Sequence, residues 1–149
     1  MVRKDKDPDN CYLDYEVKIF TRQSKSGIGK IDVRLNYNDK CFAAFDNNVL
    51  VHESWIFKKK LLARQLGLRN VYTVGDSYTI PKYRQKGIYT NVLKLIISQR
   101  DKDLVIFVSP ENIASVKAIE KAGFKKSFEF ELLRFLGFKI RLQKHEGKN

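Results

Sequence analysis

The sequence predicts one mixed α/β domain, and two observations support this prediction. The first half of the 149-residue chain holds short runs in which apolar and polar residues alternate, the pattern of half-buried strands. From residue 71 onward, strand-like and helix-like runs take turns, which is typical of strand–helix–strand units. Because no linker-like segment divides the chain, we expect residues 1–149 to form a single domain. We expect mobile tails at 1–10 and 145–149.

The composition favours anionic partners. Twenty-nine Lys and Arg residues against 17 Asp and Glu give a formal net charge of +12, which suits a nucleic acid, a membrane surface or a polyphosphate ligand. No apolar run approaches the roughly 18 residues of a membrane span. No apolar segment follows the first basic residues, so we expect no signal peptide and a cytoplasmic protein. Cys11 and Cys41 fit no metal-ligand spacing, and we expect no metal site.

Alternating patterns predict four strands in the first half. Residues 15–19 alternate around Val17, and residues 31–37 alternate strictly between apolar and polar side chains. Residues 41–45 and 49–52 then flank Asp46-Asn47-Asn48, whose residues tolerate a left-handed backbone, so we expect a β-hairpin there. The pattern shows no helix between residues 11 and 54.

The second half alternates between helices and strands. We expect a short helix over residues 55–66, ended by Gly67, and a strand over 71–80, stopped by Pro81. Apolar residues at helical spacing predict a helix over 87–100.

A continuous apolar run at 103–108 predicts a strand buried on both faces. The next helix should start near Ser109-Pro110 and end at Gly123, and a closing pair of strands should occupy 128–132 and 138–142. The unit from 71 to 108 should be a right-handed crossover between parallel strands.

The link between the strand at 71–80 and its following helix has the features of an anion site. A helix N-terminus exposes unpaired amides and about half a positive charge. Gly87 allows a bulky phosphate to approach the backbone, and Arg84 and Lys86 add cations. The amides of residues 85–89 would point into one concavity. We interpret this as a pyrophosphate site, although an ordinary strand-to-helix turn explains the loop alone equally well.

Two elements of the chain together resemble the acyl-CoA motifs of the GNAT superfamily of N-acyltransferases. The family has a strand ending near proline, followed by Q/R-x-x-G-x-G/A at the start of a helix, and Arg84, Gly87 and Tyr89 stand at its three marked positions. After the next strand, the family's N-x-x-A/S…K-x-G-F element is matched by Asn112, Ser115, Lys121, Gly123 and Phe124. The two matches cover roughly residues 71–126. The stretches 52–55 and 86–89 also resemble a subgroup associated with bacterial surface-polysaccharide genes.

The resemblance implies a mixed, mostly antiparallel sheet that is splayed open between its fourth and fifth strands, with flanking helices. Acetyl-CoA or another acyl-CoA would lie in this gap as cosubstrate, with pantetheine beside the strand at 71–80. The implied cofactor-binding residues are Thr79, Ile80, Arg84, Gln85, Lys86, Gly87, Ile88, Tyr89, Asn112 and Ser115. The family normally has one or two helices after its first strand, whereas the pattern here places its first helix at 55–66.

The transfer reaction needs a neutral amine, so a carboxylate or histidine near the acyl carbon is expected. Asp76 in the predicted strand and His52 at the end of the hairpin are our candidates for the base, and Glu53 is a weaker one. The family often supplies a tyrosine that protonates the leaving thiolate, but Ile119 occupies its place. A water, Tyr78 or Tyr89 would have to serve instead.

We therefore predict a cytoplasmic N-acyltransferase, an acetyltransferase by resemblance, that passes a short acyl group from acyl-CoA directly to an amine. The acceptor would be a small molecule, for which a nucleotide-linked amino sugar is one example. A basic nucleic-acid-binding module is the alternative from another class, but no stacking pattern of aromatic and basic residues supports it. A degenerate GNAT fold that binds CoA without turnover also stays open, and so does a homodimer.

Overall fold

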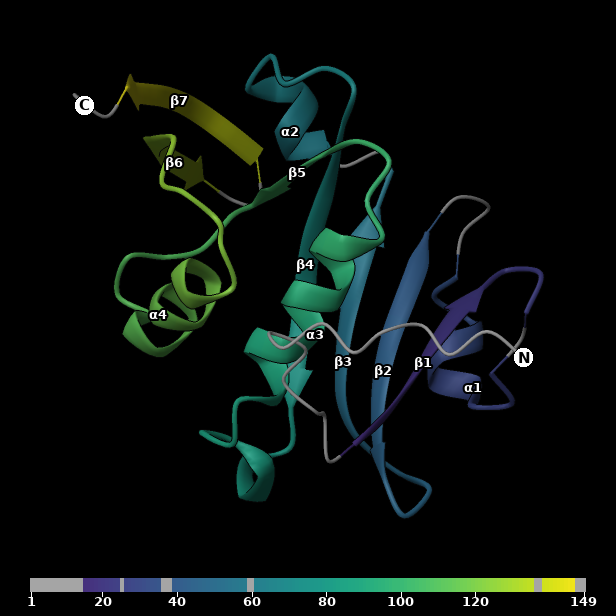
Figure 1. Cartoon of the computed structure of the whole chain (residues 1–149). Helices are drawn as coiled ribbons and strands as arrows, with labels where there is room; N and C mark the ends of the chain where they lie inside the picture. Colours follow the sequence, from purple (N-terminus) through teal and green to yellow (C-terminus); the bar gives the residue numbers. More distant parts are fainter. Residues whose placement is uncertain (1–14, 25, 36–38, 59–60, 136–137, 147–149) are drawn as a thin grey trace.

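The structure is a computed structural model that describes residues 15–24, 26–35, 39–58, 61–135 and 138–146. A five-stranded sheet in the order β1-β2-β3-β4-β5 forms its centre. The strands are β1 (Glu16–Thr21), β2 (Lys40–Asp46), β3 (Val49–Phe57), β4 (Val71–Thr79) and β5 (Asp103–Ile106). All neighbouring strands are antiparallel except β4 and β5. The predicted fold class, a mixed and mostly antiparallel sheet with flanking helices, is confirmed (Figure 1).

The hairpin of β2 and β3 carries the largest share of the buried core. Its turn has Asn47 and Asn48 at φ angles of 46° and 67°, the left-handed conformation that asparagine tolerates best among non-glycine residues. Alternate side chains of β2 enter different clusters on the two faces of the sheet. Phe42 packs under α3 (Ile88–Ser98), while Cys41 packs with Trp55 and Ile31 on the opposite face. The predicted hairpin is confirmed.

The strand predicted at residues 31–37 is wrong. A short helix, α1 (Gly29–Asp32), occupies its start, and Tyr37 lies outside the described residues. The Asp32 carboxylate accepts hydrogen bonds from the Ser26 amide at 2.7 Å, the Ser26 hydroxyl at 2.8 Å and the Gly27 amide at 3.2 Å. Such local bonds stabilise a turn in place of a ladder. The chain therefore does have a helix after its first strand.

The helix predicted at residues 55–66 is also wrong over its first part. Strand β3 continues to Phe57, and α2 covers only Leu61–Gln65. Trp55 stands between Cys41 of β2 and Gly75 of β4, so pairing on both edges of β3 overrides the helical spacing. Gly67 follows α2 with a φ of 75°, as expected for a helix-ending glycine.

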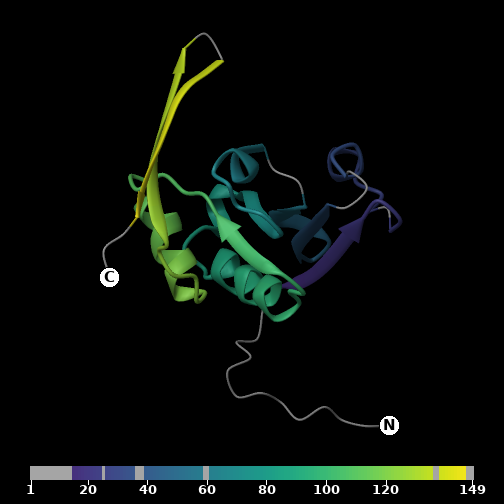
Figure 2. The same cartoon turned by 90° about the horizontal axis from the view of Figure 1, so that it is seen from above.

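The sheet opens where β4 and β5 part. The two strands pair in parallel only from Val71 to Val74, and β5 ends at Ile106. Beyond that point, the described part of the chain places no strand on this edge of β4. We name this edge, Gly75–Thr79, the open edge. The splayed sheet that the resemblance implied is thus present. Figure 2 shows α3 on one face of the sheet and α1 on the other.

The remaining elements follow β5. Helix α4 (Ile113–Lys121) begins after Asn112, whose side-chain oxygen accepts from the Ser115 amide at 3.2 Å, so the helix starts later than Ser109-Pro110 suggested. Strands β6 (Phe128–Phe135) and β7 (Phe138–Glu146) pair with each other in a separate sheet, which confirms the closing pair. Figure 2 shows this hairpin extending away from the main sheet. Strand β7 includes the first two residues of the predicted C-terminal tail.

None of the helices in the described ranges is long and apolar enough to cross a membrane.

Candidate functional site

A β-bulge interrupts β4 at the open edge. Glu53 pairs with Tyr78 and Trp55 pairs with Gly75, so Asp76 and Ser77 together stand opposite the single residue Ser54. Asp76 has a φ of 49°, in the left-handed region that non-glycine residues rarely adopt. The bulge lies just beyond the end of the β5 pairing. Because that pairing stops at Val74, the open edge of β4 carries no neighbouring strand in the described part of the chain.

The segment 80–87, which we name the basic loop, leads from the open edge into α3. It contains the 3-10 turn η1 (Pro81–Tyr83), and the Tyr83 hydroxyl donates a 2.8 Å hydrogen bond to Asp46 in the hairpin turn. Gly87 stands at the N-cap of α3 with a φ of 76°, and no side chain caps the helix. The first amides of α3 therefore remain available to an anion. The exposed side chains of this loop are those of Pro81, Lys82, Arg84, Gln85 and Lys86.

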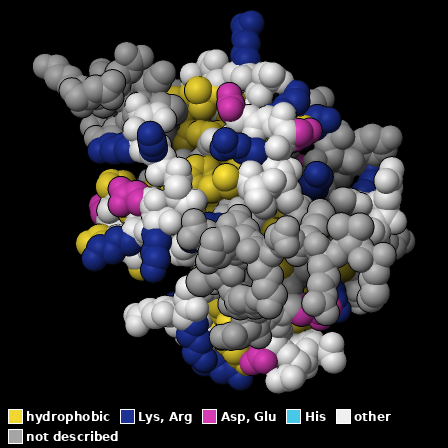
Figure 3. All heavy atoms as spheres, viewed as in Figure 1, with side chains coloured by type: hydrophobic (Ala, Val, Ile, Leu, Met, Phe, Trp, Pro, Cys, Tyr) yellow, Lys and Arg dark blue, Asp and Glu magenta, His cyan; other side chains and the backbone are white. Residues whose placement is uncertain are grey.

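Arg84 links the loop to the open edge. Its Nε donates a 3.1 Å hydrogen bond to the Thr79 carbonyl, and its guanidinium lies 5.8 Å from the centre of the Tyr78 ring. Figure 3 shows a recess in the surface between α4 and the basic loop, with basic side chains on both sides of it. The recess, the helix terminus and the cations together make a site that suits a phosphate or pyrophosphate.

Tyr89 stands where the resemblance expects a small residue. Its ring lies 5.6 Å from the His52 ring and packs against the core cluster, so the side chain points toward the sheet. Its hydroxyl hydrogen-bonds to Ser77. Burial raises the pKa of this phenol, and the hydrogen bond to Ser77 offsets part of that rise. The Tyr89 hydroxyl therefore adds a polar group to the buried space between α3 and the sheet.

Five side chains form a continuous series of hydrogen bonds between the sheet and α3. We name them the hydroxyl chain: Thr79, His52, Ser54, Ser77 and Tyr89. His52 Nδ1 lies 2.7 Å from Thr79 Oγ1, and His52 Nε2 lies 2.8 Å from Ser54 Oγ. Ser54 Oγ lies 2.8 Å from Ser77 Oγ, which reaches Tyr89. Both ends of this chain, Thr79 and Tyr89, are among the predicted cofactor-binding residues.

His52, a predicted base, lies at the centre of the hydroxyl chain. It is 1% exposed, and burial lowers its pKa from 6.5 to about 4. The imidazole is therefore neutral at pH 7, with one nitrogen donating and the other accepting. It does not face the open edge directly. A proton could reach it only through the hydroxyls of Thr79, Ser54 or Ser77.

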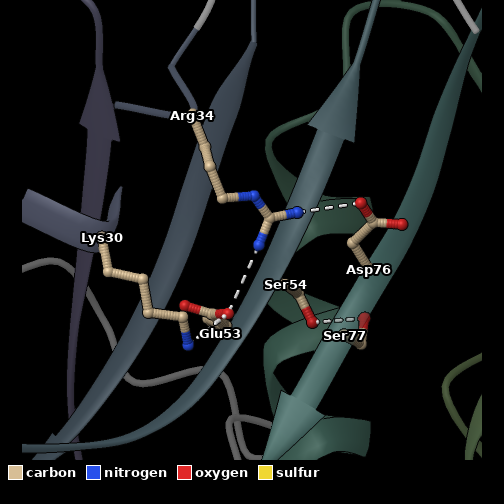
Figure 4. A network of polar contacts seen from close by, with 6 residues as sticks. All are labelled: Lys30, Arg34, Glu53, Ser54, Asp76 and Ser77. Carbon is tan, nitrogen blue, oxygen red and sulfur yellow. Dashed lines mark hydrogen bonds and ion pairs between the residues drawn. The ribbon is translucent and has the colours of Figure 1, made fainter. Parts of the chain in front are cut away.

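Asp76, the other predicted base, lies on the opposite face of the sheet in a group of four charged side chains. We name Lys30, Arg34, Glu53 and Asp76 the charge cluster (Figure 4). Arg34 bridges the two carboxylates, with Nη2 2.9 Å from Asp76 Oδ2 and Nη1 3.5 Å from Glu53 Oε1. Lys30 Nζ lies 3.0 Å from the same Glu53 oxygen. The sheet thus separates the two predicted bases.

Tyr78, the predicted proton donor, shares the face of the charge cluster. Its side chain is 48% exposed, and the Lys30 ammonium lies 5.8 Å from its ring centre. Since it directly follows the bulge, its phenol borders the open edge. Ile119 of α4, in contrast, is buried in the core with α3, so α4 offers no proton donor at that position.

Asn112 and Ser115, which were predicted to bind the cofactor from beyond β5, lie at the start of α4. Asn112 is exposed, and its side-chain oxygen is already used to cap the helix at the Ser115 amide. Its side-chain amide nitrogen remains as a donor for a ligand. The described residues contain no group of three or more His, Cys, Asp or Glu side chains arranged to hold a metal ion.

Several residues of the site were not predicted from the sequence. Lys30 and Arg34 fall in or beside the segment whose alternation was mistaken for a strand. Ser54 and Ser77 lie 23 positions apart, and only the register of β3 and β4 brings them together. The one sequence signal is that Ser54 continues the polar run of His52 and Glu53 in a central strand whose other residues are apolar.

No protein-family model matches the chain, and no curated protein gives a significant match. Among solved structures, the chain is similar to the aminoglycoside N-acetyltransferase AAC(6')-Iy in complex with CoA, with a TM-score of 0.60 and 14% sequence identity. The match covers 80% of this chain and 98% of that one. At this identity the likeness establishes the fold, which is the GNAT fold. It gives no support to the finer resemblance to the surface-polysaccharide subgroup, which stays a prediction.

Proposed function

We propose that this protein is an N-acyltransferase that moves an acetyl or other short acyl group from acyl-CoA to an amine. The main support is one conjunction: the bulged open edge of β4 leads directly into the basic loop and the uncapped N-terminus of α3. An extended thioester arm needs backbone partners along a strand, and its pyrophosphate needs an anion site at the end of that strand. The structural neighbour was solved with CoA bound, in line with this proposal.

In the proposed complex, pantetheine lies along the open edge and adds hydrogen bonds to β4 in the manner of a strand. The pyrophosphate meets the amides of residues 85–89, with Arg84 and Lys86 beside it. Asn112 and Ser115 contact the arm from the α4 side. The net charge of +12 accelerates the encounter with the polyanionic cosubstrate.

The reaction forms one bond and breaks one. The neutral amine nitrogen attacks the acyl carbon, and a backbone amide on the open edge of β4 stabilises the oxyanion that develops. The C–S bond then breaks, CoA leaves as a thiolate, and the amine nitrogen gives up one proton. A second proton transfer converts the thiolate to the thiol.

The two faces of the sheet offer different groups for these proton transfers. Asp76, at the bulge and half-exposed, can take the amine proton directly or through a water. His52 can take it only through the hydroxyl chain. Tyr78, exposed beside the bulge, is the proposed donor to the thiolate, because Ile119 of α4 is apolar and buried.

Calorimetric titration with acetyl-CoA tests the proposal. The wild-type protein should bind one equivalent, and changing Arg84→Glu together with Gly87→Val should abolish binding. The first change reverses a charge at the pyrophosphate, and the second forces a branched side chain into a left-handed backbone beside it. The matched control, Lys94→Glu with Gly67→Val, makes the same changes away from the loop and should bind normally. No binding by the wild-type protein would refute the acyltransferase proposal.

A CoA-binding protein without turnover is the second candidate function. The observation that favours it is the buried, apolar Ile119 at the position where the family often has its proton donor. CoA binding without thiol release on a broad panel of amines would support this candidate. Location in the cytoplasm and assembly as a homodimer stay predictions from the sequence.

A further inference from the structure

The charge cluster lies on the face of β4 that an acceptor amine would use. Helix α3 and the hydroxyl chain fill the other face of the sheet behind the open edge. An attacking amine therefore has to approach from the face of Asp76, Tyr78 and Glu53. Glu53 pairs directly with Tyr78, one position from the bulge, so it lies one strand in from the open edge and on the face of Tyr78.

Glu53 has one carboxylate oxygen to which no described residue forms a hydrogen bond. Its side chain is 4% exposed, and Oε1 forms ion pairs with both Lys30 and Arg34. Oε2 is buried and has no hydrogen-bond partner among the residues that the structure describes. An unmatched buried carboxylate oxygen costs stability, and it is a group that an incoming ammonium or amine can satisfy.

The two cations of the charge cluster differ in how firmly they are held. Arg34 touches both carboxylates and lies 4.5 Å from the centre of the Trp55 ring, so its position is fixed by three partners. The Lys30 side chain is 58% exposed, and within the described ranges its ion-pair partner is Glu53 alone. A primary ammonium of a ligand can take the place of the Lys30 ammonium on Glu53. The displaced Lys30 ammonium then pairs best with an anionic group of the same ligand.

We propose that the acceptor is a zwitterion, an amine that carries a carboxylate or phosphate a few bonds away, and that the charge cluster binds both of its ends. Glu53 and Asp76 hold the amine end, and Lys30 and Arg34 hold the anionic end. Such a ligand adds no net charge to two cations and two carboxylates that are already balanced. A polyamine would instead bring further positive charge to a protein of net charge +12. This inference rests on the proposed function and names its substrate class.

The test uses pairs of amines that differ only in the anionic group, each offered with acetyl-CoA while thiol release is followed. The pairs are 4-aminobutyrate against 1,4-diaminobutane, and glucosamine 6-phosphate against glucosamine. The zwitterion of at least one pair should have a kcat/KM about ten-fold or more above that of its partner, as expected for one charge-assisted interaction. An equal or better rate with the partner in both pairs would overturn the inference.

Two substitutions test the two ends of the charge cluster. Glu53→Gln should lower kcat/KM for the zwitterion about ten-fold while leaving the calorimetric affinity for acetyl-CoA unchanged. Arg34→Gln should lower the ratio of kcat/KM for the zwitterion to kcat/KM for the amine of the same pair that lacks the anionic group. Lys94→Gln, which removes an exposed charge on α3, is the control. It should change neither kcat/KM for the zwitterion nor the ratio within the pair. Thermal unfolding shows that each variant is folded.

The outcomes separate this inference from the proposed function. Failure of the wild-type protein to bind acetyl-CoA refutes the function itself. Binding of acetyl-CoA with transfer to the diamine or glucosamine in preference leaves the function intact and overturns the zwitterion. Binding of acetyl-CoA with no transfer to any of the four amines also counts against the zwitterion.

Discussion

Lowering the pH from 7 to 5 should destabilise the protein through His52. The buried imidazole has a pKa of about 4, whereas the unfolded chain has the ordinary value of 6.5. Between these values the unfolded state binds a proton that the folded state does not. The stabilisation is therefore fully present above pH 6.5 and is lost as the pH falls toward 4. At pH 5 these pKa values give a loss of about 2 kcal/mol in the free energy of unfolding.

The assay is urea unfolding at pH 7 and pH 5 for the wild-type protein and for His52→Asn. Asparagine stays neutral in both states and keeps a hydrogen-bonding side chain between Thr79 and Ser54. The carboxylates titrate in both proteins, so their contribution cancels when the two are compared. The stability advantage of the wild-type protein should shrink by about 2 kcal/mol at pH 5. An advantage that is the same at both pH values would refute the buried, neutral His52 and with it the hydroxyl chain.

Three further predictions concern the loop, the core and α4. Gly87→Ala and Gly67→Ala should each cost about 1 kcal/mol of stability, because both glycines are left-handed, but only Gly87→Ala should weaken acetyl-CoA binding in calorimetry. An equal loss of affinity in both would contradict the anion site. Burial raises the pKa of the Cys41 thiol to about 12. A Cys11→Ser variant, which leaves Cys41 as the one cysteine of the sequence, should therefore show no reactive thiol at pH 8 until urea is added. Rapid labelling of the folded variant would contradict this. Ile119→Tyr should destabilise the core by about 1–3 kcal/mol in urea unfolding, without raising the transfer rate. A faster enzyme would show that α4 can supply the donor.

The sequence predicted the elements whose signals are local. The Asp-Asn-Asn turn defines the hairpin because its residues accept left-handed angles. The apolar spacing of residues 88–96 defines α3 because only one face of that helix meets the sheet. The basic loop could be proposed as an anion site for the same reason: its cations, Gly87 and the start of α3 are contiguous in the chain.

The two mistaken elements show where local periodicity fails. Residues 31–35 alternate as a strand would, yet three hydrogen bonds to Asp32 fold the chain into a turn before it, and Val33 is left 83% exposed. Ile56 fits the helical spacing of Leu61, Leu62 and Leu66, but β2 and β4 both pair with β3 at Trp55 and Ile56.

The candidate site could be predicted only in part, because strand register brings together the members of the hydroxyl chain and of the charge cluster. His52 and Thr79 are 27 positions apart, and Arg34 and Asp76 are 42 positions apart. The bulge at Asp76 reverses the side-chain alternation of β4, and Gly75 and Asp76 are only a weak local signal of it. His52 and Asp76 were therefore predicted for the same role, although the structure puts them on opposite faces of the sheet.

The most direct measurement of the central claim is a crystal structure of the protein with acetyl-CoA. We predict that pantetheine pairs with the open edge of β4 and that the pyrophosphate touches the amides of residues 85–89. The acyl carbon should lie beside the bulge, on the side of Asp76 and Glu53. A CoA bound elsewhere, or an open edge that stays empty at a saturating concentration of acetyl-CoA, would contradict the account.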